Sequence, residues 1–308
     1  MRLSFIDTAK FLAILFVVIG HCGVTNLSIF LYAFHVQLFF IVYGFVYTKK
    51  NLQVTEFIKK SVKRILVPYV LVYLILSTKS LPIGLINMLY GSRESLEHVS
   101  HLWFLPSFFM SCVFFFVLMN KLQGSYRYFL LSIIFVLGYI TRYEVELPVH
   151  LGCKVYYLTG MLRESSDSAR RIGMIWGINA SFVGTILMYL GYLLRQLYNR
   201  YKSKIHDHNI IICIISLIIG LSLFYINQSY IPSDFSYGFV ALANAVYGNY
   251  LLFIVVSVVI TVAILCLSLS IDNQIFSRYG RETMAIYAFH PVFIGLVGKY
   301  LPPIMGGG

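Results

Sequence analysis

A succession of long apolar runs, separated by short loops, constrains this fold more than any other feature of the sequence. A helix needs about 20 predominantly apolar residues to cross the hydrocarbon core of a bilayer. On that criterion, membrane helices are predicted near residues 4–24, 28–48, 65–78, 102–120, 128–141, 174–194, 209–226, 247–270 and 283–300. The third and fifth of these runs are short. Asp7 and Lys10 interrupt the first run, which favours a retained helix over a cleaved signal peptide.

The composition sets the fold class. Hydrophobic residues make up 59% of the 308 residues and charged residues only 12%, with a mean hydropathy of +0.79. A soluble domain of this length would need more charge to cover its surface, so these values are typical of a polytopic membrane protein. We therefore predict an all-α membrane bundle of about nine or ten transmembrane helices. Residues 1–308 show no internal repeat or soluble appendage and are predicted to form a single domain.

Basic loops predict the orientation of the bundle. Loop 49–64 carries six basic residues and one acid, and loop 195–204 carries four basic residues and no acid. Two further loops carry the pairs Lys121 with Arg127 and Arg278 with Arg281. Positive loops of membrane proteins face the cytoplasm, so the N-terminus is predicted to be cytoplasmic. Segment 142–173 stays open, because residues 147–162 either form a tenth crossing or lie at the membrane surface.

The net charge of +12 does not indicate a nucleic-acid partner, because the basic residues cluster in the short loops. No metal site is predicted either, since the sequence has no HExxH motif. Its cysteines lie far apart, mostly in apolar runs, without metal or disulfide spacing, and are interpreted as packing residues. These are Cys22, Cys112, Cys153, Cys213 and Cys266.

Ionisable residues of the first run share one face of the predicted helix. His21 follows Lys10 by about three turns plus roughly 20°, so the two side chains lie on one face, about 16 Å apart along the axis. Asp7 lies one turn before Lys10 on nearly the same stripe. A charge that faces lipid at mid-depth costs several kcal/mol, so this stripe is predicted to face the interior. The structural alternatives are a Lys10 that reaches the headgroups and a neutral His21 that bridges helices.

A second histidine is expected close to the first. His35 lies in the first turns of the next predicted helix, and helices joined by a tight loop are antiparallel neighbours. His21 and His35 can therefore approach each other at similar depth. Imidazole exchanges protons near neutral pH, and ionisable residues inside a membrane are functional candidates by default.

At this point the motifs resemble a known family. The spacing from Lys10 to His21, introduced by "FID", resembles the opening motif of the acyltransferase-3 family of bacterial integral-membrane O-acyltransferases, where arginine is commoner than lysine. "FHVQLFFIVYGFVY" is similar to the family's second helix. "FIKKSVKRILVPY" is similar to its basic loop, through Arg64, Pro68 and Tyr69. "HLWFLPSFF", "MYLGYLLR" and "TMAIYAFHP" resemble later segments in family order.

The resemblance implies an activity and a location. Members of the family move an acyl group, usually acetyl from cytoplasmic acetyl-CoA, onto hydroxyl groups of cell-surface glycans. The expected partners are therefore acetyl-CoA as donor substrate, a cell-surface glycan or lipid-linked sugar as acceptor, and the lipid bilayer, with no bound cofactor. The expected location is the cytoplasmic membrane of a bacterium. Capsule, O-antigen and exopolysaccharide all remain open as acceptors.

The resemblance also suggests roles for individual residues. His21 is expected to be the general base for the attacking hydroxyl or, alternatively, to carry the acetyl group on a ring nitrogen. His35 would assist it, and Arg64 would stabilise the oxyanion. The remaining residues are expected to bind the donor or line the site: Lys10, Lys59, Lys60, Lys63, Tyr69, Trp103 and His290. For the loop lysines and Arg64, the alternative is the ordinary positive charge of a cytoplasmic loop; for Trp103 it is the interfacial belt.

Three rival interpretations stay open on the sequence alone. A transporter or flippase for a lipid-linked glycan would also use buried histidine and lysine, but it predicts inverted repeats that the sequence does not show. A sensor or assembly subunit would use His21 only for stability. The chain would also fit an inactive, truncated family member, because it ends soon after "FHPVF".

Overall fold

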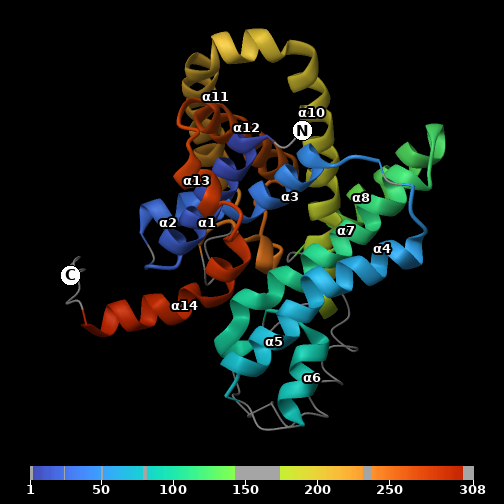
Figure 1. The fold of residues 1–308 in the computed structure, drawn as a ribbon, viewed down its shortest axis with the longest axis vertical. Coiled ribbons are helices and arrows are strands. Elements are labelled where there is room, and N and C mark those ends of the chain that lie inside the picture. The colour runs from blue at the N-terminus through green and yellow to red at the C-terminus, as the bar shows by residue number, and fades with distance from the viewer. Residues whose placement is uncertain are drawn as a thin grey trace. The chain divides into compact units, whose positions relative to one another are not determined.

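A computed structural model describes residues 3–23, 25–49, 51–78, 82–93, 95–142, 174–231 and 238–300 (Figure 1). Helices account for 82% of this part of the chain. It contains no strand, only an antiparallel bridge between Ala241 and Val246. Five helical spans are long and apolar enough to cross a membrane: Asn26–Val46, His98–Asn120, Ile175–Asp207, Asn209–Gln228 and Tyr250–Ser270. Gly124–Ile140 and Thr283–Lys299 are shorter apolar helices. The predicted all-α membrane fold is confirmed.

The chain divides into two compact units, which are described separately. The first consists of residues 1–46, 190–240 and 247–308. Its elements are α1 (Ser4–Gly20), α2 (Asn26–Tyr32), α3 (His35–Val46), the second part of α10 (Ile178–Asp207), α11 (Asn209–Gln228), α12 (Tyr250–Ser270), α13 (Gln274–Tyr279) and α14 (Thr283–Tyr300). Within this unit α1 packs against α2, α3, α12, α13 and α14.

Small residues let the helices of the first unit approach closely. Ala9 and Ala13 of α1 are completely buried in the core of this unit. A Cβ on Gly280, just after α13, would overlap the backbone carbonyl of Asp7, and one on Gly191 of α10 would overlap that of Ile41 in α3. Helices in membranes associate mainly through such packing, because lipid is as apolar as their side chains. These contacts hold α1 at the centre of the unit.

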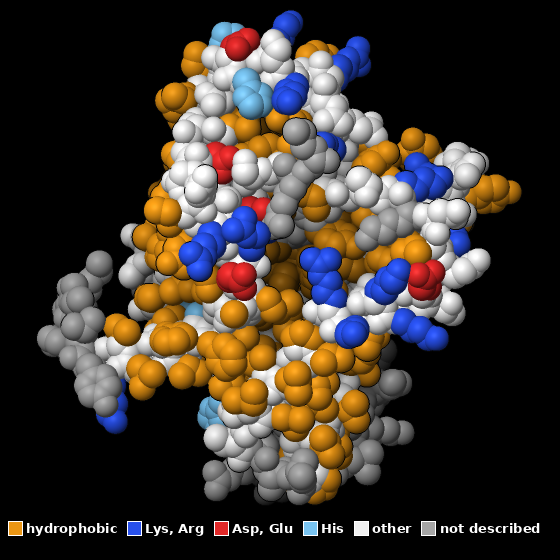
Figure 2. Space-filling view, in the orientation of Figure 1, with side chains coloured by type: hydrophobic (Ala, Val, Ile, Leu, Met, Phe, Trp, Pro, Cys, Tyr) orange, Lys and Arg blue, Asp and Glu red, His pale blue; other side chains and the backbone are white. Residues whose placement is uncertain are grey.

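The second unit consists of residues 47–189 and 241–246. Its helices are α4 (Val54–Ser61), a π-helical turn (Val62–Leu66), α5 (Val67–Leu76), α6 (Ile83–Tyr90), a 3₁₀ segment (Glu97–Trp103), α7 (Phe104–Asn120), α8 (Gly124–Ile140) and the first part of α10. Buried hydroxyls join α7 to α10: the Ser181 hydroxyl donates to the carbonyl of Ser107 at 3.0 Å, and the Ser111 hydroxyl donates to that of Ser181 at 3.0 Å. Figure 2 shows lysine and arginine gathered over α4, whereas the visible faces of α5 and α6 are apolar.

The structure corrects several predicted boundaries. Residues 195–204, predicted as a loop, are helical and belong to α10, which has a kink at Tyr201. The sequence there has no proline or glycine to end the helix. The basic loop 49–64 contains α4 and the π-helical turn. The predicted helix 28–48 is interrupted at residues 33–34, between α2 and α3. Segment 147–162 lies outside the described residues.

Candidate active site

Three imidazole rings meet in the first unit. The ring of His21 lies 6.4 Å from that of His35 and 4.9 Å from that of His290, measured between centroids. The approach of His21 to His35 agrees with the prediction from the tight loop. His290 was expected to line the site, but its contact with His21 was not predicted. This contact brings the last helix of the described chain against the end of the first.

Local sequence features place His21 and His35. His21 is the first residue after α1, and its backbone N–H still donates to the carbonyl of Val18. The chain turns at Gly23, whose φ of 146° is readily adopted by glycine but not by residues with a side chain. Thr25 and Ser28 then form a reciprocal capping box that starts α2. His35 begins α3 after a two-residue break. The two histidines thus flank a short helical connection.

Each of the three rings is oriented by a backbone carbonyl three or four residues earlier in the chain. The Nδ1 atoms lie 2.8 Å from the oxygen of Val17 for His21, 2.6 Å from that of Leu31 for His35, and 2.8 Å from that of Tyr287 for His290. A carbonyl oxygen only accepts hydrogen bonds, so Nδ1 must carry the proton. In the neutral ring the lone pair then lies on Nε2. The arrangement therefore supplies three imidazoles whose basic atom is Nε2.

The three rings differ in exposure. His21 is exposed, whereas His35 and His290 are 1% and 2% exposed. The Nε2 atom of His35 is buried, and no described residue hydrogen-bonds it. A buried polar atom left without a partner costs about 1–3 kcal/mol, so this nitrogen favours a ligand or water that can donate a hydrogen bond. His21 is the ring that a large substrate reaches most directly.

Tyr32 is a member of the cluster that the sequence analysis missed. Its ring lies 5.8 Å from that of His21 and 5.0 Å from that of His35. Phe239, from the segment before α12, contacts the same ring at 5.0 Å. Tyr32 precedes His35 by three positions, so the spacing of one helical turn could have identified it. An aromatic wall on a histidine site is suited to the apolar face of a sugar or to an acyl group.

The other end of α1 carries a second polar cluster. The Lys10 ammonium forms an ion pair with Asp7 at 3.1 Å, and the Asp7 side chain is only 4% exposed. On α1 the hydroxyls of Ser4 and Thr8 both donate to Asp272, the latter at 2.6 Å. Lys10 is therefore anchored by a carboxylate. The helical rise puts it about 16 Å from His21, at the opposite end of the same helix.

The remaining predicted site residues belong to the second unit. Arg64, Lys59 and Lys63 are exposed, and Lys60 pairs with Glu56 at 2.7 Å. The other two, Tyr69 and Trp103, are buried. The roles of these six residues stay predictions.

Tyr69 and Trp103 are the buried pair. The Tyr69 hydroxyl donates to the carbonyl of Met88 at 2.7 Å. Trp103 is 7% exposed, with its ring edge-on to Phe104 at 6.3 Å.

Among the described residues, no group of His, Cys, Asp or Glu is arranged to hold a metal ion.

Comparison with known proteins identifies the family. The sequence model of the acyltransferase-3 family, described as an acyltransferase domain, matches residues 3–306. Neither the curated proteins nor the solved structures include a match to the chain. The family match covers nearly all of the sequence, including all three histidines of the cluster and both ends of α1. The chain belongs to the acyltransferase-3 family and is a multi-pass membrane acyltransferase.

Proposed function

We propose that this protein transfers an acetyl group from cytoplasmic acetyl-CoA to a hydroxyl of a cell-surface glycan or of its lipid-linked precursor, in the cytoplasmic membrane of a bacterium. One observation carries the proposal: an exposed His21, whose Nδ1 donates to a backbone carbonyl, presents a basic Nε2 beside two buried imidazoles. Family membership favours an enzyme over the transporter or sensor, and the positive-inside orientation puts Lys10 nearer the cytoplasmic side than His21.

In the direct route, Nε2 of His21 takes the proton of the acceptor hydroxyl as its oxygen attacks the thioester carbon. The carbon–sulfur bond breaks, the acetyl group becomes an ester of the glycan, and the imidazolium returns the proton to the CoA thiolate. A sugar hydroxyl is a poor nucleophile at neutral pH, so a positioned base accounts for typically 10²–10⁴-fold of the rate. The buried rings exclude water from one side of the base.

The acyl-carrier route uses the same atoms in a different order. Nε2 of His21 attacks the thioester and releases CoA, and the acceptor hydroxyl then attacks the acetyl-imidazole. The second step needs another base, because Nε2 of His21 is occupied. Nε2 of His35 is the candidate for that role, because no described residue hydrogen-bonds it and its ring lies 6.4 Å from that of His21. The histidine cluster therefore has a base for either route.

Groups outside the cluster would serve the donor and the developing charge. Lys10 is suited to an anionic part of the donor, since it is a half-buried ammonium on the stripe that leads to His21. We assign Lys59, Lys60 and Lys63 to electrostatic attraction of CoA phosphates on the cytoplasmic side. Arg64 and the indole N–H of Trp103 remain candidates for stabilising the oxyanion, and the Tyr69 oxygen and His290 for lining the site.

The test uses membranes that contain the overexpressed protein and the host's own glycans. Incubation with acetyl-CoA labelled in the acetyl group should move label into glycan as alkali-labile ester. Unlabelled propionyl-CoA, added in competition, reports whether the site is restricted to acetyl. Label that stays in CoA with every glycan offered, although the protein is folded, would contradict the proposal.

A further inference from the structure

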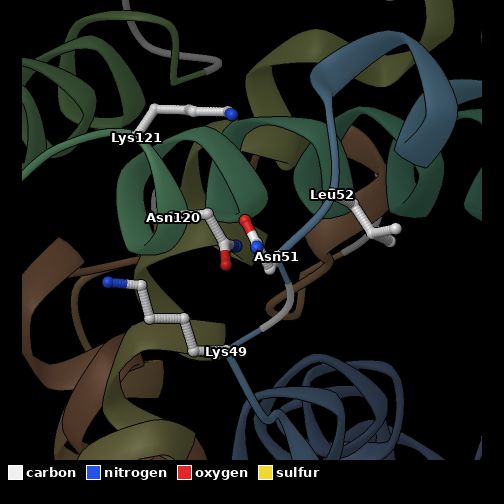
Figure 3. Close-up of a pocket in the computed structure, with 5 residues that line it drawn as sticks. All are labelled: Lys49, Asn51, Leu52, Asn120 and Lys121. Atoms are coloured by element: carbon white, nitrogen blue, oxygen red, sulfur yellow. The ribbon is translucent and has the colours of Figure 1, made fainter.

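A polar pocket lies in the second unit. Its volume is about 430 Å³, and it is lined by Lys49, Asn51, Leu52, Asn120 and Lys121 (Figure 3). The first three residues follow α3, and the last two end α7. Two loops that the charge pattern places on the cytoplasmic side therefore meet around one cavity. The volume is within the range of small-molecule sites, but four of the five lining residues are polar.

The positive charge of the pocket is uncompensated. Lys49 and Lys121 form no ion pair with any residue that the structure describes, in contrast to Lys10 and Lys60. No carboxylate lines the cavity. Two ammonium groups around one cavity repel each other, and an anion bound between them would relieve that repulsion.

The lining amides also suit an anion. Asn120 is fixed by its Nδ2 atom, which donates to the hydroxyl oxygen of Tyr47 and to the carbonyl of Phe116 at 3.0 Å. In Figure 3 the amides of Asn51 and Asn120 face each other between the two lysines.

We propose that this pocket binds the phosphate groups of a ligand, with Lys49 and Lys121 as the charged contacts and the Asn51 amide as a further donor. The inference rests on the proposed function for the identity of the ligand, because CoA is the phosphate-bearing substrate on the cytoplasmic side. Lysine binds phosphate as a point charge, without the fixed fork geometry of arginine. An anionic phospholipid headgroup of the inner leaflet offers the same chemistry, so the experiment must separate the two sources.

The experiment compares the purified wild type in a neutral detergent with the double variant Lys49→Ser/Lys121→Ser. The matched control is Lys202→Ser/Lys204→Ser, which removes the same charge from two exposed lysines of α10. Calorimetric titration measures the binding of CoA, of inorganic pyrophosphate, and of pantetheine, which has the thiol arm of CoA but no phosphate. Native mass spectrometry of protein extracted from phosphatidylcholine vesicles containing phosphatidylglycerol measures retained anionic lipid.

We expect CoA and pyrophosphate to bind the pocket variant at least about tenfold more weakly, because two charged contacts are lost, while pantetheine binding and the control are unchanged. Unchanged CoA binding together with loss of phosphatidylglycerol would assign the same pocket to a lipid headgroup. Unchanged binding of CoA, pyrophosphate and lipid would overturn the inference. If the wild type binds pyrophosphate but not CoA, the proposed donor fails while the pocket stands.

Discussion

The rings of His21 and His290 lie 4.9 Å apart, centroid to centroid, although they belong to the first and last helical segments of the described chain. His290 is buried, whereas His21 is exposed, and each ring donates from Nδ1 to a backbone carbonyl. The exposed base is therefore backed by a second imidazole whose orientation is fixed. This relationship makes α14 part of the candidate active site.

Replacing His290 with asparagine should separate a chemical role from a structural one. The asparagine amide can still donate to the carbonyl of Tyr287, but it has no basic nitrogen in the Nε2 position. We expect kcat to fall about tenfold with KM nearly unchanged, and the thermal stability to change by no more than about 1 kcal/mol. Steady-state kinetics and thermal unfolding in detergent measure both. Wild-type kcat in His290→Asn would show that only the hydrogen bond to Tyr287 matters.

Binding of acetyl-CoA should require a positive charge at position 10, and arginine should serve as well as lysine. Lys10→Arg keeps the charge and should keep KM for acetyl-CoA within about threefold of wild type. Lys10→Met removes the ammonium that pairs with the buried Asp7 carboxylate, so it should raise KM and also destabilise the protein, by about 1–3 kcal/mol. The double variant Asp7→Asn/Lys10→Met removes both charges and should recover stability without recovering KM. Recovery of both would show that Lys10 acts only through folding.

Close packing of α10 on α3 should make Gly191 intolerant of a side chain. In Gly191→Ala the new Cβ overlaps the carbonyl oxygen of Ile41, so the two helices must separate, at a cost of about 1–3 kcal/mol. Gly295 of α14 is the matched control, since a Cβ there meets no atom within 4 Å. Gly295→Ala should be neutral or stabilising by up to about 1 kcal/mol. Equal stability of the two variants would contradict the helix contact.

The pH dependence of stability should depend on Tyr47. Burial raises the pKa of this phenol above its ordinary value of 10.0, partly offset by the hydrogen bond from Asn120. A tyrosine whose pKa is higher in the folded state than in the unfolded state contributes stability at pH values below its unfolded-state pKa. This contribution is lost as the pH rises through the folded-state pKa. Between pH 8 and 11, the melting temperature should therefore fall less steeply with pH for Tyr47→Phe than for the wild type. Parallel curves would place Tyr47 in a solvated environment.

Local patterns predicted the helices, but not the contacts between distant segments. The apolar runs identified α1, α7, α11 and α12 because membrane helices satisfy their backbone internally and need little help from neighbours. The prediction of a loop at 195–204 was wrong, because charge marks the end of the hydrocarbon region and not the end of a helix. These residues are helical, with a kink at Tyr201. Hydropathy indicates where a helix leaves the membrane. Capping residues and helix breakers determine where the helix itself ends.

The candidate site divides in the same way. The spacing within α1 and the tight loop that follows it predicted that His21 and His35 would meet. The contact of His290 with His21 depends on how α14 packs on α1, and no short-range pattern encodes that. The pocket between Lys49 and Lys121 was missed for the same reason, because each lysine alone is an ordinary residue of a basic loop.

The most direct test of the central claim is to measure alkali-labile acetyl esters on surface glycans by NMR. Wild type, His21→Ala and the control His208→Ala, an exposed histidine at the start of α11, would be expressed to equal levels in a host that lacks the gene. We predict esters with the wild type and with His208→Ala, and none above background with His21→Ala. Equal ester with His21→Ala and the wild type would contradict the account, because it would remove His21 from the chemistry.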